Sequence, residues 1–454
     1  MGGNWREYQI GEIAEISGGS TPSTADPANF NGEIPWLTPK DLSGPHDRYV
    51  SRGERNLSRK GLECCSAKLL PACTVLITSR APIGYVAIAK NPIATNQGFR
   101  NLVLKPGFDS GFLYYWVRAH IEELQRYSSG STFQELSGSA LAQIRIRVPP
   151  LPEQRAIAHI LGTLDDKIEL NRRMSQTLEE MARAIFKSWF VDFDPVRAKA
   201  AVRREHPDWT NAQVTRAAIQ RAPGCLPLQP EIAELFPDSF VDSELGEIPE
   251  GWGIASFTDG VDVIGGGTPI TSNPGYWGGD IPWFSVIDTP KAGEVFTICT
   301  EKSVTQLGID NSSARILPVG TTIISARGTV GNLALVGVPM AMNQSCYGLR
   351  DRREMAGYFL YFATHAVVET LRQRGHGSVF NTITRDTLNG VRVVAPPYEL
   401  VAAFERVIGG LLLRLLASLH QSRTLSALRD ALLPKLISGE LRVPDAERIV
   451  ERIG

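Results

Sequence analysis

The sequence predicts an α+β protein in which two similar mixed α/β domains are joined by a pair of long antiparallel helices. Residues 152–191 carry apolar side chains at alternating intervals of three and four, which is the seam of a coiled coil. The same stripe returns 247 residues later, and this offset also relates the sequence before each helix. Short β-rich runs between Gly and Pro turns, mixed with segments of helical spacing, predict an α+β class for each repeated part.

Length and composition are those of a globular protein with several domains. The chain has 454 residues, whereas single cores seldom grow beyond roughly 250 residues. No apolar run approaches the roughly 18 residues of a membrane helix, and the N-terminal sequence has no signal-peptide layout, so we expect no membrane association and a cytoplasmic location. The 6 cysteines show no CxxC pair and no His at zinc spacing, which predicts free thiols and no metal site.

An internal repeat organises the chain, because residues separated by 247 positions match from one end to the other. The matching pairs include Trp5 and Trp252, Gly19 and Gly266, Pro22 and Pro269, Trp36 and Trp283, Gly84 and Gly331, Tyr114 and Tyr361, and Pro150 and Pro397. The repeat predicts the following division: globular domains at 1–150 and 247–397, long helices at 151–191 and 398–440, a connector at 192–246 and a tail at 441–454.

Each globular repeat predicts the same local elements. Runs at 74–78 and 85–89, repeated at 321–325 and 333–336, are expected to be strands, and 112–127 with its copy from 359 is expected to be helical. The prolines at 149, 150 and 152 are expected to end the strand-rich part and to start the first long helix, since Pro is tolerated in a first helical turn.

The two long helices are predicted to pack on each other through their seams. The apolar seam residues are Leu161, Leu164, Ile168, Leu178, Ile185, Ile408, Leu411, Leu415, Leu425 and Leu432. Polar residues in the middle of both seams, Asn171 and Ser175 in one and Ser418 and Ser422 in the other, either form a shared buried layer or are partly exposed. Arg429, at a seam position, favours a frayed or solvent-facing end, and Pro434 is expected to end the second helix near Leu433.

The connector has no counterpart elsewhere in the chain. We expect it to contain one short helix near 211–222. Its basic run is interpreted as a solvated face, with DNA contact as the less favoured alternative.

The motifs of several enzyme classes are missing from the sequence. There is no Gly-Lys dipeptide for a P-loop, no GxGxxG in a βαβ frame, no HExxH and no GxSxG. Asp165 and Asp166 precede a lysine in a loose nuclease-like pattern, but they fall within the helical stripe and are interpreted as surface charge. The 395–398 segment, APPY, resembles the base-holding loop of aminomethyltransferases but has Ala where a polar side chain is needed. We therefore expect no catalytic residues in this chain.

Polar residues in turn contexts are candidates for DNA contact, because Arg pairs with guanine and Asn or Gln with adenine in the major groove. Those that recur at the offset, or align with recurring turns, are Thr21, Arg80, Asn96, Gln97 and Ser131, with Thr268, Arg327, Asn343, Gln344 and Ser378. For the Asn-Gln pairs we favour a structural role in capping backbone groups, and for the two arginines we favour DNA contact. Non-repeated loop residues are better candidates for reading sequence, since two half-sites of different sequence require the domains to differ: Lys40, Arg100, Thr132, Asn381, Thr384 and Arg385.

Specific sequence motifs resemble the specificity subunit of type I restriction-modification systems over nearly the whole chain. They are IPW at 34–36 and 281–283, TSRAPIG at 78–84 and SARGTVG at 325–331, NQ at 96 and 343, PPLPEQRAIAHILGTLDDKIELN in the first long helix, SWFVDFDPV and ELGEIPEGW around the connector, and ALLPKLISGEL near the end. The second long helix opens with PPYELVAAFE instead of repeating LPEQ, so a partner contact made by that opening is expected to differ between the helices.

The resemblance implies two target recognition domains that each read one half of a bipartite double-stranded DNA site. It also implies helices that separate these domains and dock modification subunits, two in number, and restriction subunits that translocate and cut. S-adenosylmethionine, ATP and Mg would then be bound by the partner subunits and not by this chain. The net charge of −1 leaves open an alternative, a non-catalytic scaffold whose repeated domains bind other proteins, because free-standing DNA-binding domains are usually basic.

Overall fold

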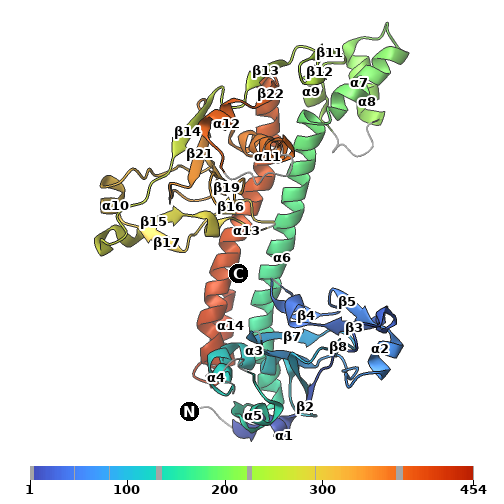
Figure 1. The fold of residues 1–454 in the computed structure, drawn as a ribbon, viewed down its shortest axis with the longest axis vertical. Helices are drawn as coiled ribbons and strands as arrows, with labels where there is room; N and C mark the ends of the chain where they lie inside the picture. The colour runs from blue at the N-terminus through green and yellow to red at the C-terminus, as the bar shows by residue number, and fades with distance from the viewer. Residues whose placement is uncertain are drawn as a thin grey trace. The chain divides into compact units, whose positions relative to one another are not determined.

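The computed structural model describes residues 5–44, 46–80, 82–128, 135–221, 228–291, 293–374 and 382–452. The chain divides into two compact units (Figure 1). The first unit comprises residues 1–170 and 422–454, and the second comprises residues 171–421. Each unit contains one α/β domain and one part of each of two long helices.

The first α/β domain is built on a five-stranded sheet with the strand order β2-β9-β6-β7-β4. The strands are β2 (Ala14–Gly18), β9 (Phe99–Leu104), β6 (Val75–Ser79), β7 (Ile83–Ala89) and β4 (Tyr49–Val50). A three-stranded sheet contains β5 (Arg55–Leu57), β3 (Phe30–Leu37) and β8 (Ala94–Thr95), and a two-stranded antiparallel sheet contains β1 (Arg6–Gln9) and β10 (Arg145–Val148). The helices are α1 (Ile10–Ile13), α2 (Arg59–Glu63), α3 (Ser110–Ala119), α4 (Ile121–Arg126) and α5 (Gly138–Gln143).

The core of this domain lies between the five-stranded sheet and α3. Val75 and Ile77 of β6 are fully buried and cluster with Phe112 and Tyr115 of α3. The side chain of Asp109 accepts a hydrogen bond from the backbone nitrogen of Phe112 at 3.0 Å and so caps the start of α3. The helix thereby begins where its apolar face meets the sheet.

The second α/β domain repeats this topology with the strand order β14-β21-β18-β19-β16. Its strands are β14 (Val261–Gly265), β21 (Cys346–Asp351), β18 (Thr322–Ser325), β19 (Leu333–Val336), β16 (Phe296–Thr297), β17 (Lys302–Val304), β15 (Trp277–Phe284), β20 (Ala341–Met342), β13 (Gly253–Ser256) and β22 (Arg392–Ala395). Its helices are α10 (Gln306–Asp310), α11 (Gly357–Arg374) and α12 (Arg385–Asn389).

The registers of the two domains correspond at the sequence offset. Ile16 pairs with Leu102 in the first domain, and their counterparts Val263 and Leu349 pair in the second. Strands β3 and β15 also share a register shift at equivalent positions. The predicted fold class and its internal repeat are therefore confirmed.

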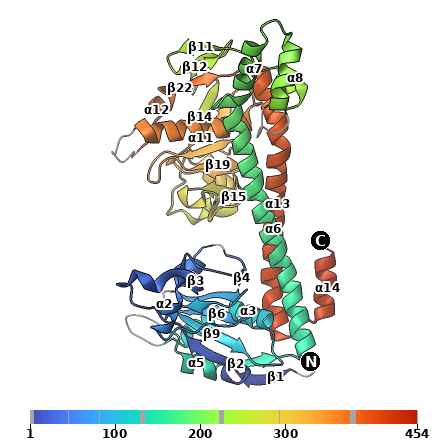
Figure 2. The ribbon, with the colours of Figure 1, turned by 90° about the vertical axis from the view of Figure 1, so that its right-hand side faces the viewer.

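Two long helices each contribute to both units: α6 (Leu151–Phe190) and α13 (Tyr398–Ser438). In the second unit they run antiparallel, because Asn171 contacts Gln421 whereas Phe186, later in α6, contacts Phe404, earlier in α13. Figure 2 shows the two helices side by side within that unit. In the first unit α6 and α13 meet through an ion pair between Asp165 and Arg429 at 2.7 Å.

The predicted seam residues belong to the two main apolar clusters. Leu161, Leu164, Ile168, Leu425 and Leu432 lie in or against the cluster of the first unit. Leu178, Ile185, Ile408, Leu411 and Leu415 lie in or against that of the second. In the second unit the polar middle is buried at Asn171, Ser175 and Ser418, and the Nδ2 of Asn171 donates to the Oε1 of Gln421 at 2.9 Å. A shared buried layer is thus present at these three positions, whereas Ser422 is half-buried.

Two predictions about the second long helix are wrong. Helix α13 continues through Pro434 to Ser438, with Leu432, Leu433 and Leu436 buried around the proline. Tertiary packing on both sides of the proline offsets the lost backbone hydrogen bond. Arg429 is largely buried and paired with Asp165 instead of facing solvent. Beyond the helix, α14 (Val443–Glu451) packs on the first unit through the buried Ala446.

The connector contains more structure than the single short helix predicted from the sequence. It has α7 (Asp194–Glu205), α8 (Asn211–Arg221), α9 (Pro230–Ala233) and a hairpin of β11 (Phe240–Ser243) with β12 (Gly246–Pro249). Its basic residues are largely engaged internally: Lys199 is buried, Arg203 pairs with Asp238, and Arg221 pairs with Glu205. Lys199 therefore departs from the predicted solvated face, whereas Arg221 lies in an exposed pair, and DNA contact by this run stays an untested alternative.

The carboxylate of Glu405 on α13 lies at the start of α11. Its Oε1 accepts a hydrogen bond from the backbone nitrogen of Phe359 at 2.7 Å. Burial raises the pKa of Glu405 to about 7 against the lowering effect of this bond. The folded protein therefore binds a proton that the unfolded chain has already released between about pH 4.5 and pH 7.

We expect this proton to make stability pH-dependent. As the pH rises from 5 to 8, the free energy of unfolding should fall by about 2 kcal/mol through Glu405. The variant Glu405→Gln should lack this component, which denaturant unfolding at several pH values would reveal as a smaller decline. Identical pH profiles of the two proteins would contradict the assignment.

Candidate DNA-reading site

Three strand ends meet at one edge of the five-stranded sheet of the first domain. Strand β2 ends at Gly18, which pairs with Arg100 near the start of β9, and β6 ends one residue after Thr78, which pairs with Phe99. Because neighbouring antiparallel strands reverse direction, the turns that follow β2 and β6 and precede β9 lie together at this edge. The segment before α5 joins them, since the backbone nitrogen of Leu136 donates to the oxygen of Ser79 at 2.9 Å. We call this edge the strand-end face.

The strand-end face carries Thr21, Asn96 and Gln97, whose side chains link or close the turns there. The hydroxyl of Thr21 donates to the Oε1 of Gln97. The Oδ1 of Asn96 accepts from the backbone nitrogen of Gly98 at 2.9 Å, which closes the turn before β9. These contacts are those of the structural role that we favoured.

The second domain repeats this pattern. Thr268 donates to Gln344, and the Oδ1 of Asn343 accepts from the backbone nitrogen of Ser345 at 3.0 Å. The two domains therefore share one polar framework on their strand-end faces. Contact of Thr21, Asn96, Gln97 and their three counterparts with DNA stays a prediction.

The Gly18-Gly19 turn provides a direct test of this framework. A Cβ on Gly19 would lie 2.2 Å from the backbone oxygens of both Thr95 and Asn96, whereas a Cβ on Gly18 would lie 3.6 Å from the Nη1 of Arg100, an ordinary van der Waals contact. We expect Gly19→Ala to lower the free energy of unfolding by about 2–3 kcal/mol through overpacking. Gly18→Ala, the matched control, should cost less than about 1 kcal/mol. Denaturant unfolding would decide, and equal losses would contradict the packing.

Two arginines and one carboxylate gather on the strand-end face of the first domain. Arg100 donates from Nη2 to the Oε1 of Glu135 at 2.8 Å and from Nη1 to the backbone oxygen of Phe99 at 3.0 Å. Arg80, directly after β6, approaches the Oε2 of Glu135 at 3.8 Å. The Arg100 side chain is 16% exposed, whereas Arg80 is 39% and Glu135 is 37% exposed. The sequence did not single out Glu135, because no local pattern connects it with arginines in two other segments.

The second domain presents arginines at the equivalent edge without that carboxylate. Arg327 forms an isolated backbone bridge with Thr382, the counterpart of Glu135. Arg385 is the first residue of α12, which Thr384 caps by accepting a hydrogen bond from the backbone nitrogen of Thr387 at 3.0 Å. The Nη2 of Arg385 lies 3.8 Å from the position of a Cβ on Gly265. Within the described ranges, neither arginine forms an ion pair.

Of the remaining candidates for DNA contact, Lys40 is described by the structure and four others are not. Lys40 follows Pro39, whose ring lies against Gly98, and pairs with Glu54 at 2.9 Å on the surface. Ser131, Thr132, Ser378 and Asn381 lie outside the described residues.

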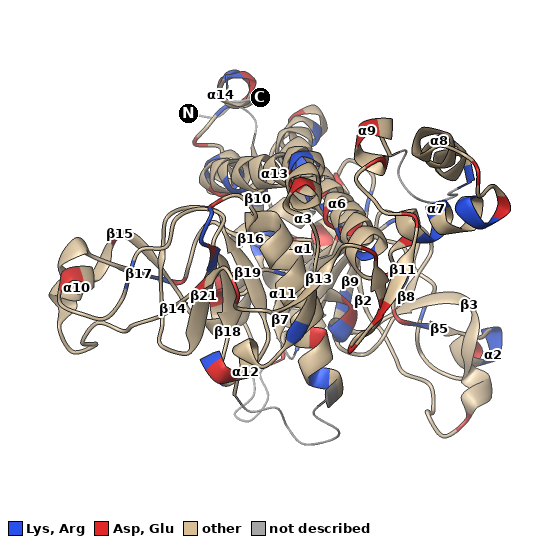
Figure 3. Cartoon of the chain, turned by 90° about the horizontal axis from the view of Figure 1, so that it is seen from above, with Lys and Arg blue, Asp and Glu red and all other residues tan. Residues whose placement is uncertain are grey.

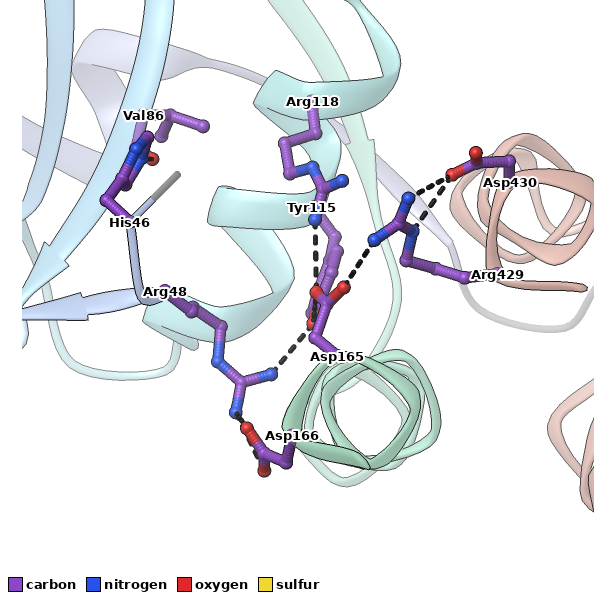
Figure 4. A network of polar contacts seen from close by, with 9 residues as sticks. All are labelled: His46, Arg48, Val86, Tyr115, Arg118, Asp165, Asp166, Arg429 and Asp430. Atoms are coloured by element: carbon purple, nitrogen blue, oxygen red, sulfur yellow. Dashed lines mark hydrogen bonds and ion pairs between the residues drawn. The ribbon is translucent and has the colours of Figure 1, made fainter. Parts of the chain in front are cut away.

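A network of polar contacts holds the first domain to its long helices (Figure 4). The carboxylate of Asp165 accepts hydrogen bonds from the Tyr115 hydroxyl at 2.6 Å, from Arg118 at 3.0 Å and from Arg429 at 2.7 Å. Burial raises the pKa of Tyr115, with the Asp165 carboxylate adding to the effect, so the hydroxyl stays a donor. Arg48 donates to Tyr115 at 2.7 Å.

The interpretation of Asp165 as surface charge is wrong. Its side chain is only 14% exposed, while the neighbouring Asp166 is exposed and pairs with Arg48 at 2.9 Å. Helical spacing placed Asp165 off the apolar seam but could not show that arginines from α3 and α13 converge on it.

Charges of both signs are spread over the chain (Figure 3). Among the described residues, no group of three or more His, Cys, Asp or Glu side chains is placed to hold a metal ion, and no helix is both long and apolar enough to cross a membrane. The five cysteines that fall within the described ranges are free. These observations define a class of duplicated α/β proteins with polar turns at equivalent sheet edges.

Comparison with known proteins gives the family. The model of the type I restriction modification DNA specificity domain matches residues 2–180 and 249–403, and the chain belongs to this family. It is therefore a DNA sequence-specificity subunit with two recognition domains.

Individual relatives agree over most of the chain. It is 32% identical to the type I restriction enzyme MjaIX specificity subunit of Methanocaldococcus jannaschii, over 97% of this chain and 94% of the relative. It is 29% identical to the HindI specificity subunit of Haemophilus influenzae, over 69% of this chain and 72% of the relative. The fold is similar to that of a crystallised type I restriction-modification S subunit from M. genitalium, with a TM-score of 0.57, 15% identity and coverage of 96% of this chain and 97% of the other.

Proposed function

We propose that the chain reads a bipartite double-stranded DNA site, with residues 1–150 reading one half and residues 247–397 reading the other. One observation carries this proposal: the two strand-end faces share a backbone framework but carry different side chains at equivalent positions. Arg100 corresponds to Tyr347, and Glu135 corresponds to Thr382. Recognition of two different half-sites needs the same backbone framework in both domains but different side chains on it, because side-chain contacts with bases specify sequence.

The residues proposed for this DNA-reading role are those predicted from the sequence, in which Arg100 acts by supporting its neighbours on the face and the others are available for DNA contact. In the first domain they are Thr21, Lys40, Arg80, Asn96, Gln97, Arg100, Ser131 and Thr132. In the second they are Thr268, Arg327, Asn343, Gln344, Ser378, Asn381, Thr384 and Arg385. Some of these residues would contact phosphates and position the DNA, and others would contact base edges.

We further propose that the chain works as the non-catalytic part of a larger assembly in the cytoplasm. Its long helices at 151–191 and 398–440 would dock two modification subunits, and restriction subunits would join them. S-adenosylmethionine, ATP and Mg would be bound by those partners, where the chemistry of methylation and cleavage takes place. The type I restriction enzyme names of the relatives support this assignment.

DNA binding at several salt concentrations tests the proposal. The net charge of −1 predicts weak binding by the isolated chain. Addition of modification subunits should give tight, sequence-specific binding whose affinity falls steeply with salt, because phosphate contacts release counterions. A complex that binds no DNA, or whose affinity is independent of salt, would favour a protein-binding scaffold instead.

A further inference from the structure

We propose that Arg80 and Glu135 together read one G·C base pair in the half-site of the first domain, and that Arg100 is a positioning residue that holds Glu135 in place. This inference rests on the proposed DNA-reading function and names the base pair class that the strand-end face selects. Arg80 and Arg100 contact the carboxylate of Glu135 in different ways.

Arg100 forms its hydrogen bonds within the protein and is too buried to contact a base readily. Its guanidinium donates to Glu135 and to the backbone oxygen of Phe99, and its side chain is 16% exposed. Both terminal nitrogens therefore have protein acceptors. A largely buried arginine with two acceptors fixes its partner in one orientation, since the planar guanidinium is a rigid fork.

Glu135 is held through one oxygen and open at the other. Arg100 bonds to Oε1, whereas Oε2 has only the looser approach of Arg80 at 3.8 Å, beyond hydrogen-bond distance. The side chain is 37% exposed. The structure thus presents an oriented acceptor at the edge of the domain.

Arg80 supplies the matching donor. It follows β6 directly, beside Glu135, because Ser79 and Leu136 are hydrogen-bonded through their backbones. Its side chain is 39% exposed and approaches Glu135 only at 3.8 Å. In the major groove, guanine offers O6 and N7 to an arginine and cytosine offers its N4 amino group to a carboxylate, so an adjacent Arg and Glu match the two edges of one G·C pair.

Among its described residues, the second domain has a different arrangement at the equivalent positions. Thr382 stands in the place of Glu135, and Tyr347 in that of Arg100. Arg385 instead brings its guanidinium next to Gly265, the counterpart of Gly18, which Arg100 approaches in the first domain. The second half-site should therefore not be read through an Arg–Glu pair.

Methylation kinetics of the complex with its modification subunits would test the inference. The rates are measured on duplexes with the methylation motif of the wild-type complex and on duplexes with single base-pair substitutions. Wild-type complex should discriminate a G·C pair in the first half-site by about 10-fold or more. Glu135→Gln keeps an oxygen for Arg100 but turns an amino group toward the open side. It should lose most of this discrimination, and Arg80→Ala should lose it at the same base pair.

Two further variants separate positioning from general damage. Arg100→Ala should reproduce the specificity change of Glu135→Gln at the same base pair. Arg145→Ala removes an exposed ion pair with Glu7 on strands β10 and β1 and should leave discrimination unchanged.

The outcomes distinguish this inference from the function on which it rests. Loss of discrimination at different base pairs in the two variants, a uniform fall in rate on all duplexes, or unchanged discrimination would each overturn the inference. A wild-type complex that shows no base-pair preference would instead overturn the proposed function. Loss confined to one G·C pair supports both.

Discussion

Replacing Phe404 with alanine should lower the free energy of unfolding of the second unit by about 4 kcal/mol. The side chain is fully buried on α13. Its ring lies 5.8 Å from that of Phe186, 5.9 Å from Trp189 and 5.3 Å from Phe190, all of which belong to α6. Truncation would remove the contacts of one aromatic ring and leave a cavity between the helices. Denaturant unfolding followed by tryptophan fluorescence measures the loss.

A control variant on the same helix separates packing from helix propensity. Leu413 is exposed on α13, so Leu413→Ala should change the free energy of unfolding by less than about 0.5 kcal/mol. A loss below about 1 kcal/mol for Phe404→Ala would show that the aromatic cluster does not hold the helices together.

The second large effect is expected at Asp165. Alanine at this position removes the shared acceptor of Tyr115, Arg118 and Arg429, so that Arg118 loses its carboxylate partner and Arg429 keeps only the exposed Asp430. The free energy of unfolding of the first unit should fall by about 3 kcal/mol, because an uncompensated charge in a protein interior is costly. Thermal or denaturant unfolding followed by far-UV circular dichroism measures the change.

Asp166→Ala serves as the matched control, since the neighbouring carboxylate is exposed and contacts only the Arg48 guanidinium among the ion pairs of this region. It should cost less than about 1 kcal/mol. Equal losses for the two variants would contradict the network. At the offset positions the second unit has Leu412 in place of Asp165 and Phe362 in place of Tyr115, and both belong to its apolar cluster.

The fold could be predicted because its signals repeat. A constant offset aligned Trp36 with Trp283, and the observed strands β3 and β15 that contain them share one register shift. The helix boundary after Pro150 was also readable, since proline marks a first helical turn. Signals that are local in sequence, such as turns, caps and apolar periodicity, can be recognised from one sequence alone.

The errors came from contacts between distant segments. Pro434 is a helix breaker by local rules, but buried leucines on both sides keep α13 intact. Periodicity placed Arg429 in the seam without revealing Asp165 as its partner. The same limit applies to the strand-end face, where the contact of Arg100 with Glu135 depends on how β9 and the segment before α5 come together.

Exchange of residues 1–150 for the corresponding segment of a relative that methylates a different motif tests the central claim most directly. Methylome sequencing of cells that carry the complete system would compare the motif before and after the exchange. If each domain reads its own half-site, one half of the motif should change to that of the donor and the other half should stay the same. A motif that changes in both halves, or in neither, would contradict the account.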